Sequence, residues 1–208
     1  MVFIMPVWSR ISPVLRRLPA HWSALPARPA WGWVPFIGLL LLTMTAGAAD
    51  FKVLGARTQL EKGVYLLDAR IRYQFRDEPL NALQNGVPLT VELVIEVLRR
   101  RELLWDETIA SLKQRFRLEY HTLSRQYVVT NLNSGEVKNF PELQAATDFL
   151  GRIDHFPLLD ASLLTSGGSY FARLRAELDI DALPVPLQLV AYLSTDWRLI
   201  SEWYTCSL

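Results

Sequence analysis

The sequence predicts a mainly β (α+β) fold, an antiparallel β-sandwich or curved sheet of about seven strands with one or two short helices. Apolar and polar residues alternate with period two, the pattern of a strand, in four long segments after residue 50. Two further segments have the spacing and the end signals of helices. Strands that are apolar on one side only are typical of antiparallel sheets with one buried and one solvated face.

The clearest alternation has apolar residues at the odd positions of Tyr65–Phe75 and polar residues at the even positions from Asp68 to Arg76. A helix would scatter these residues around its surface, whereas a strand places them on opposite faces. The same pattern covers residues 87–97, 112–120 and 170–180. We expect one buried core position on each of the four segments: Ile71, Leu93, Phe116 and Leu174.

Shorter strands fill the gaps between these segments. A glycine in each connection, Gly63 and Gly135, favours a hairpin turn. We expect a last strand at residues 197–204. The two expected hairpins pair residues 51–60 with 64–76, and 127–132 with 136–140.

Residues 77–84 form the first expected helix, since Asp77 and an early proline favour its start and Asn85-Gly86 its end. Residues 141–153 form the second, and its apolar face would consist of Leu143, Ala146, Phe149, Leu150 and Ile153. The sequence LPVP at 183–186 predicts a rigid extended connector. Residues 187–193 fit a strand or a helix.

The first 48 residues have the features of a secretory signal peptide. Four arginines precede an uncharged apolar run, residues 34–46, which ends in Ala46-Gly47-Ala48. The second interpretation is an uncleaved N-terminal membrane anchor, because residues 30–49 carry no charge. We therefore expect a single exported β-rich domain at 49–208, in the periplasm or anchored in the inner membrane facing the periplasm.

The composition of the domain argues against a nucleic-acid partner. Four of the 22 basic residues precede residue 49, which leaves 18 Lys and Arg against 21 Asp and Glu. Cys206 is the only cysteine, so an internal disulfide is excluded. Its thiol either pairs between chains or belongs to a frayed terminus.

Candidate chemistry is sparse. Ser169, His155 and Asp160 could form a hydrolase triad, but Gly167-Gly168 does not make a nucleophile elbow. His121 and His155 lack the spacing of zinc ligands. Asp179-Ile180-Asp181 lacks the further oxygen ligands of a calcium loop. We assign no catalytic, cofactor-binding or metal-binding residue and expect no cofactor.

Two aromatic or basic segments each allow a structural and a functional interpretation. Arg99–Arg101 precede Leu103-Leu104-Trp105, which fits an exposed loop or a contact with anionic lipid. Trp197 and Trp203 share a strand parity, which predicts that both lie in the core beside Leu199, although a ring could instead stack on a ligand.

Several segments resemble domain-of-unknown-function family 4390: Asn85–Leu89, Trp105-Asp106, the spacing Tyr120…Leu123…Tyr127, Leu183–Leu187 and, most specifically, Ser194–Trp203 (STDWRLISEW). The resemblance covers residues 51–204. It implies an exported protein of Gram-negative bacteria with no established activity, whose gene often neighbours that of a nitrogen-regulation-type sensor kinase. It assigns no functional residue.

We expect an exported non-enzymatic domain that serves as a binding or accessory module in the bacterial cell envelope. It would bind an envelope or inner-membrane protein, such as the sensor kinase, through a loop end or an exposed sheet edge. Membrane contact through an uncleaved leader is compatible with this role. The alternatives are a periplasmic small-molecule or lipid carrier and a serine hydrolase using Ser169 and His155.

Overall fold

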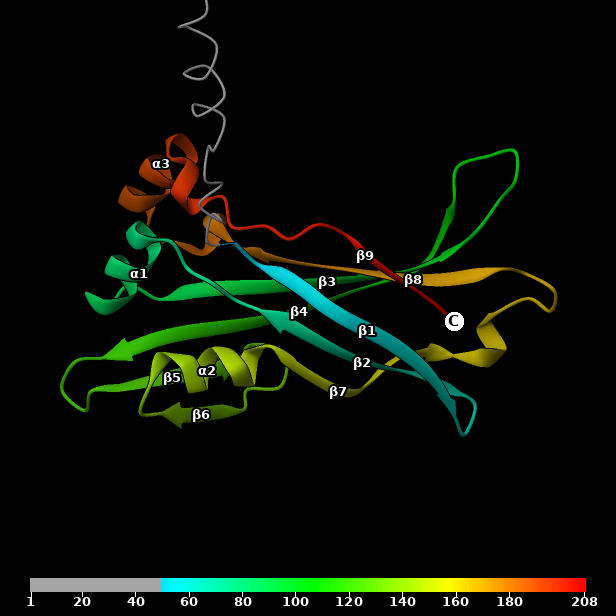
Figure 1. The fold of residues 1–208 in the computed structure, drawn as a ribbon, viewed down its shortest axis with the longest axis horizontal. Helices are drawn as coiled ribbons and strands as arrows, with labels where there is room; N and C mark the ends of the chain where they lie inside the picture. Colours follow the sequence, from blue (N-terminus) through cyan, green and yellow to red (C-terminus); the bar gives the residue numbers. More distant parts are fainter. Residues whose placement is uncertain (1–49) are drawn as a thin grey trace, which may run out of the picture. The chain divides into compact units, whose positions relative to one another are not determined.

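The computed structural model describes residues 50–208, whose strands form two antiparallel sheets (Figure 1). The smaller sheet has the order β1-β2-β7 and the larger the order β6-β5-β4-β3-β8-β9. The predicted fold class is confirmed as mainly β and sandwich-like, with nine strands and three short α-helices in the described part. The leader at 1–48 and its boundary with the domain lie outside the described residues.

The elements of residues 50–208 are mostly short. Within this range no helix has the length and apolar composition that a membrane span requires. The strands are β1 (Lys52–Glu61), β2 (Val64–Arg72), β3 (Leu89–Arg99), β4 (Glu107–His121), β5 (Gln126–Asn131), β6 (Val137–Phe140), β7 (Arg152–Asp160), β8 (Tyr170–Leu178) and β9 (Tyr204–Ser207). The helices are α1 (Asp77–Gln84), α2 (Leu143–Leu150) and α3 (Val185–Leu193), with the 3₁₀ turns η1 (Ala161–Leu163), η2 (Ile180–Ala182) and η3 (Thr195–Trp197).

Both predicted hairpins are confirmed. β1 pairs with β2 from Glu61 opposite Val64, and the turn uses Gly63 at φ +84°. β5 pairs with β6 from Thr130 opposite Val137, and its connection contains Gly135 at φ +77°. These backbone angles favour glycine because a Cβ is strained there.

The four expected core positions, Ile71, Leu93, Phe116 and Leu174, are buried between the sheets as predicted. Ala146 and Leu150 of α2 complete this core. The two sheets therefore share one apolar interior, which agrees with the period-two pattern of their strands.

β3 departs from the predicted pattern because both of its faces are covered. It lies between β4 and β8 in the middle of the larger sheet. Thr90 and Glu92, expected on a solvated face, are only 3% and 7% exposed. The Glu92 carboxylate is covered by side chains of β4, with Nζ of Lys113 at 2.7 Å and Nε of Arg115 at 3.6 Å. The central position of a strand thus buries polar residues that an edge position would expose.

The predicted helix at 141–153 is too long, and β7 was not predicted. The helix ends at Leu150, and Ile153 lies in β7 opposite Ala69. The backbone carbonyl of Gly151 accepts a hydrogen bond from the Ile71 amide at 2.8 Å. A Cβ at Gly151 would lie 2.0 Å from the Ile71 carbonyl oxygen, so the chain can turn from helix to strand here only because this residue is a glycine.

The C-terminal segment differs from the expectation in two places. Residues 187–193 belong to α3, which already starts at Val185, so the LPVP segment is only partly an extended connector. Pro186 lies in the first helical turn, where its missing N–H leaves no hydrogen bond unmade. The strand expected at 197–204 is wrong, since Thr195–Trp197 form η3 and β9 starts only at Tyr204.

The residues between η3 and β9 still follow β8, but through isolated hydrogen bonds. The Leu178 amide donates to the Leu199 carbonyl, and the Ser201 amide to the Ala176 carbonyl, both at 2.8 Å. The Ala176 amide donates to the Ser201 hydroxyl at 3.0 Å. A side-chain acceptor in place of a backbone carbonyl interrupts the ladder, which explains why the final strand is shorter than predicted.

Candidate functional site

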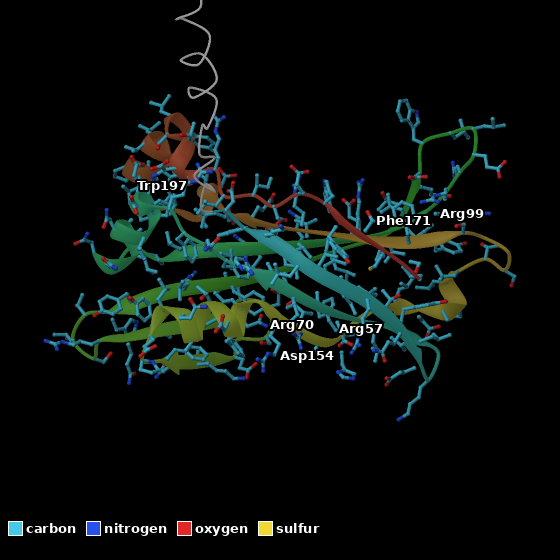
Figure 2. The ribbon with its side chains drawn as sticks, in the orientation of Figure 1. Arg57, Arg70, Arg99, Asp154, Phe171 and Trp197 are labelled. Carbon is cyan, nitrogen blue, oxygen red and sulfur yellow. The ribbon has the colours of Figure 1, made fainter. Side chains whose placement is uncertain are left out.

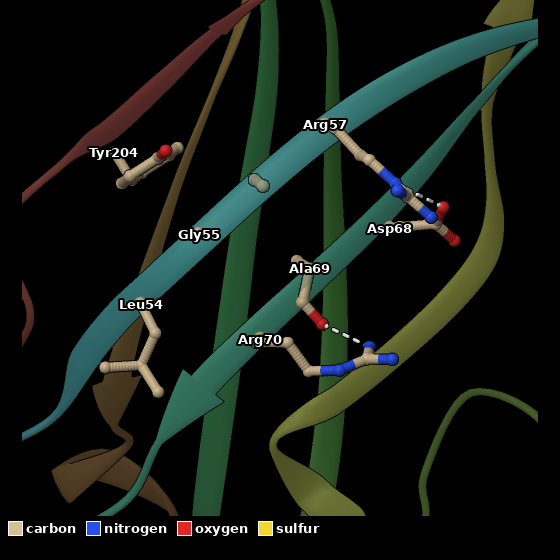
Figure 3. A pocket seen from close by; sticks show the side chains of 8 residues that line it. Leu54, Gly55, Arg57, Asp68, Ala69, Arg70 and Tyr204 are labelled. Carbon is tan, nitrogen blue, oxygen red and sulfur yellow. Dashed lines mark hydrogen bonds and ion pairs between the residues drawn. The ribbon is translucent and has the colours of Figure 1, made fainter.

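A groove crosses β1 at the edge of the smaller sheet, with β2 on one side and Tyr204 of β9 on the other (Figure 3). Its volume is about 610 Å³. The lining comes from residues 54–57 of β1, residues 68–70 of β2 and Tyr204 of β9. The close-up shows Tyr204 on one side of the β1 ribbon and the side chains of Arg57 and Arg70 on the other. This groove, called the β1 groove below, has Arg57, Asp68 and Arg70 in its walls.

The β1 groove exists because β9 runs beside β1 without forming a ladder with it. In the described part of the chain, β1 pairs with β2 alone. On its other side it meets β9, where the Thr58 hydroxyl donates to the Ser207 carbonyl at 2.6 Å. A β-bulge between Val53 and Gly55 shifts the register at the groove, and a Cβ on Gly55 would meet no atom within 4 Å. An edge of this kind offers backbone amides and carbonyls to a further strand.

The outer face of the smaller sheet places like charges directly opposite each other. Lys52 of β1 pairs with Arg72 of β2, and Arg70 of β2 pairs with Arg152 of β7. Such cross-strand pairs are repulsive and lower the stability of a sheet. Asp154 compensates part of the charge, because its Oδ1 lies 2.8 Å from Nη1 of Arg70. Figure 2 shows Arg70 and Asp154 together on this sheet.

The cations Lys52, Arg72 and Arg152 are exposed and have no ion pair within residues 50–208. The larger sheet contrasts with this. There Arg173 pairs with Glu96 at 2.6 Å and Arg175 with Glu177 at 2.8 Å. The smaller sheet therefore presents unneutralised positive charge although the domain as a whole has more acidic than basic residues.

Asp68 organises the wall of the β1 groove. It faces a two-residue bulge of β7, and its Oδ1 accepts the His155 amide at 2.8 Å. Its Oδ2 accepts Nε of Arg57 and Nε2 of Gln59, each at 3.1 Å. The backbone hydrogen bond from His155, helped by Arg57, lowers the pKa of the Asp68 carboxyl below its usual value. Asp68 thus stays ionised and holds the Arg57 side chain in place.

A second, smaller hollow adjoins the first at Tyr204 and has a volume of about 330 Å³. Lys52 and Arg72 line it together with the acidic residues Asp50 and Glu202. Asp50 pairs with Arg76 at 3.3 Å. The cations Lys52 and Arg72, unpaired in the described residues, therefore lie at this second hollow, whereas Arg57 and Arg70 of the β1 groove are paired with Asp68 and Asp154.

The structure does not bring the candidate hydrolase residues into a triad. His155 lies at φ +52° in the β7 bulge with its Nδ1 3.8 Å from Oδ1 of Asp68. Asp160 accepts the Ser162 amide at 2.8 Å and caps η1, and these hydrogen bonds lower the pKa of its carboxyl. The Ser169 carbonyl accepts the Arg100 amide at 2.8 Å. Within residues 50–208 no hydrogen bond or ion pair joins Ser169, His155 and Asp160 to one another.

The candidate calcium residues have separate structural partners. Asp179 pairs with Arg115 and accepts the Ala182 amide at 3.2 Å, which caps η2. Asp181 accepts a hydrogen bond from the Tyr192 hydroxyl. Across the described residues, no group of three or more His, Cys, Asp or Glu side chains lies close enough to hold a metal ion.

The arginine-rich segment forms the predicted exposed loop, residues 100–106 between β3 and β4. Leu103 and Trp105 are 95% and 92% exposed. The Arg100 guanidinium lies 5.4 Å from the ring centre of Phe171, and Arg101 pairs with Glu107. The loop therefore combines exposed apolar side chains with cations.

The two C-terminal tryptophans have different environments. Trp197 is buried beside Leu199 as predicted, and its Nε1 donates to Glu78 at 2.9 Å. Trp203 is only half-buried, and the guanidiniums of Arg173 and Arg175 lie 4.5 and 4.7 Å from its ring centre. The prediction for Trp203 is wrong because η3 breaks the strand parity on which it rested.

Cys206 is not at a frayed end. It lies in β9 opposite Ala172, half-buried, and burial raises the pKa of its thiol. A raised thiol pKa lowers the fraction of reactive thiolate.

The β1 groove was missed in the sequence because its charged residues come from two strands, β1 and β2, and the basic sheet face around it extends to a third, β7. The alternation at 64–76 does show Arg70 and Arg72 on one face, but Arg152 lies in the strand that was not predicted. One signal in the sequence could have indicated the basic face. It is the number of cations on the predicted polar face of residues 64–76, counted together with Lys52 and Arg57 across the hairpin.

Comparison with protein families matches the family described as "Domain of unknown function (DUF4390)" over residues 48–207. Comparison with the curated proteins and with the solved structures gives no match. The matched range contains both sheets, all three helices and the β1 groove. The chain therefore belongs to the DUF4390 family.

Proposed function

We propose that this chain is a non-enzymatic binding module of the bacterial cell envelope that takes up an extended, acidic segment of an envelope protein in the β1 groove. The observation that carries the proposal is that the edge of β1 facing β9 has no ladder partner in the described residues, on a sheet whose outer face also carries the unpaired cations Lys52, Arg72 and Arg152. The edge would supply backbone hydrogen bonds, and the cations would select acidic side chains.

Strand addition suits the shape of the β1 groove. A peptide that adds to a sheet edge gains its affinity from main-chain hydrogen bonds and its specificity from the sites that receive alternate side chains. Leu54 and Tyr204 offer apolar contacts, and Arg57 and Arg70 lie on the same groove at the outer face. Charge on an edge strand also protects it from pairing with a second copy of itself.

The charge of the partner follows from the sheet face. Repulsion between Lys52 and Arg72, and between Arg70 and Arg152, is relieved when a carboxylate lies between them. Attraction of an acidic segment to this face also speeds its association at low salt. An envelope protein with an acidic extended segment is therefore the partner class that the face fits.

The envelope location rests on the leader, whose features are those of an export signal or anchor. The resemblance that links the family to sensor kinases makes an inner-membrane receptor a natural partner. A carrier role finds less support, because the lining of the β1 groove includes Arg57, Asp68 and Arg70 and is open along its length. A ligand that co-purifies with the full chain and raises its intact mass would favour the carrier.

Site-specific photo-crosslinking in intact envelopes tests the proposal. A photoreactive residue replaces Leu54, at the groove, in the full chain. The matched control replaces Val137 on the edge strand β6, since the two side chains are 49% and 56% exposed. We expect a discrete protein adduct at position 54 and none at 137. Equal adducts at both positions, or none at 54, would overturn the proposed site.

A further inference from the structure

α3 carries an apolar surface that nothing in the described part of the chain covers. Residues 182–195 include no charged side chain. Ala191 faces the interior of the domain and is fully buried. Five large apolar residues of the helix are between 51% and 88% exposed: Val185, Leu189, Val190, Tyr192 and Leu193.

The exposed surface belongs to a helix that is fixed in place. Nε2 of Gln188 donates to the carbonyls of Asp181 and Leu183 at 2.8 and 2.9 Å. Just after the helix, the Ser194 hydroxyl donates to Glu78 of α1 at 2.9 Å, and this carboxylate also accepts from Trp197. The apolar residues of α3 are therefore a permanent feature of the surface, and leaving so many of them in water is unfavourable.

The first described residue lies at the same end of the domain as α3. Asp50 pairs with Arg76, and Nη1 of Arg76 donates to the Thr195 carbonyl of η3 at 2.7 Å. η3 in turn contacts α3 and α1. The chain therefore leaves this domain next to the exposed helix.

The sequence before Asp50 indicates what covers α3. The apolar run at 34–46 ends only three residues before Asp50, and residues 30–49 are uncharged. An extended chain spans at most about 14 Å over that interval. With the apolar run in a bilayer, as in the anchor interpretation, the end of the domain that carries α3 is held within that distance of the lipid.

We propose that the exposed apolar face of α3 lies in the interfacial region of a lipid bilayer, with loop 100–106 as a second contact. An uncharged helix surface with a tyrosine at its rim suits the boundary between headgroups and acyl chains. This inference concerns lipid and stands independently of the partner proposed for the β1 groove.

Loop 100–106 is placed to make the second contact. The pairing of β3 with β8 puts the loop and α3 at opposite ends of these strands, because Arg99 lies opposite Tyr170 and Val91 opposite Leu178. Figure 1 shows that α3 and the loop nevertheless project to the same side of the sheets. Leu103 and Trp105 at the loop tip can therefore meet the same flat surface as α3, and Arg100 can contact lipid phosphates.

The two contacts differ in their electrostatics. Glu78, Asp181 and Asp196 lie beside α3, so its contact with lipid must be apolar. At the loop Arg101 pairs with Glu107, and Glu102 and Asp106 also lie there, so Arg100 is the cation that can strengthen the contact with anionic lipid. High salt should weaken the loop contact and leave the α3 contact nearly unchanged.

Fluorescent labels on the full chain in lipid vesicles test this inference. Cys206→Ser removes the native thiol, and single cysteines at Leu193→Cys, Leu103→Cys or Val137→Cys carry an environment-sensitive dye. The vesicles contain phosphatidylcholine with or without phosphatidylglycerol, and brominated lipid serves as quencher. Val137 lies on β6, away from α3 and the loop in Figure 1.

We expect the emission of the label at 193 to shift to shorter wavelength and to be quenched by brominated lipid in both vesicle types. The label at 103 should show this shift and quenching mainly in vesicles that contain phosphatidylglycerol. The label at 137 should show neither effect in either vesicle type. Without lipid quenching at 193 the inference is wrong. A blue shift at 193 without lipid quenching would show that a second copy or another protein covers α3, which also overturns it.

Discussion

At the residue scale, Asp68 explains how an irregular strand is accommodated. The bulge at Asp154 and His155 leaves a backbone amide pointing at β2, and the Asp68 carboxylate accepts it at 2.8 Å. The same carboxylate holds Arg57 at the β1 groove. A single acidic residue therefore connects the packing of β7 with the charge of the candidate site.

Replacing Asp68 with asparagine should make the stability of the domain depend less on pH. The folded state lowers the pKa of the Asp68 carboxyl, so its stabilisation is complete above the unfolded value and is lost as the pH falls through the folded value. Asp68→Asn should therefore be less stable than the parent at pH 7, and the difference should shrink below about pH 4.

Urea unfolding at a series of pH values measures this difference. Glu61→Gln is the control, because Glu61 is exposed at the end of β1 and has no ion pair in the described residues. If the free energies of unfolding of Asp68→Asn and the parent differ by the same amount at every pH down to 2, the role assigned to the Asp68 carboxylate is wrong.

At the element scale, the sequence was a good guide where a strand or hairpin follows its local rules. The β1–β2 and β5–β6 hairpins have glycine in their turns, and α1 has clear end signals. The β-bulges in β1 and β7 could not be predicted from the sequence. The turn at Gly63 alone would pair Lys52 with Tyr73 and turn it toward the core, but the bulge after Val53 pairs it with Arg72 on the outer face.

β7 was missed for the same reason. The bulge at Asp154 and His155 breaks the alternation between Ile153 and the apolar residues after it, so period-two analysis finds no strand. Because β7 and the bulge in β1 complete the basic face, most of the fold but little of the candidate site could be predicted.

The junction between α2 and β7 gives a sharp test of the element boundaries. Gly151→Ala places a methyl group 2.0 Å from the Ile71 carbonyl oxygen, so the backbone must shift and the hydrogen bond between Gly151 and Ile71 weakens. We expect a loss of about 1–3 kcal/mol in the free energy of unfolding, the usual effect of overpacking.

Gly55→Ala is the matched control, since its Cβ would meet no atom within 4 Å. Chemical denaturation of both variants should find Gly55→Ala within about 0.5 kcal/mol of the parent. If the two substitutions have the same effect, the close approach of Gly151 to β2 is not present in solution.

At the scale of the whole molecule, the charges divide between the sheets. Most cations of the larger sheet are paired with acids, as Lys113 is with Glu92, although Arg117 on β4 is exposed and has no ion pair in the described residues. The smaller sheet leaves Lys52, Arg72 and Arg152 unpaired in the described residues. The domain has more acidic than basic residues, yet this asymmetry gives it one basic face. That face adjoins the edge of β1 that borders the groove of about 610 Å³.

One measurement tests directly whether the basic face of the smaller sheet selects the partner. It is the yield of the adduct formed by a photoreactive residue at position 54 in full-length chains with one charge reversed. Arg72→Glu reverses an unpaired cation of the smaller sheet, and Arg117→Glu reverses an exposed arginine on β4 of the larger one. If the basic face selects the partner, Arg72→Glu abolishes or strongly reduces the adduct, while Arg117→Glu leaves it at the level of the parent. An adduct that survives Arg72→Glu, or that falls equally in both variants, would contradict the claim that the basic face of the smaller sheet selects the partner.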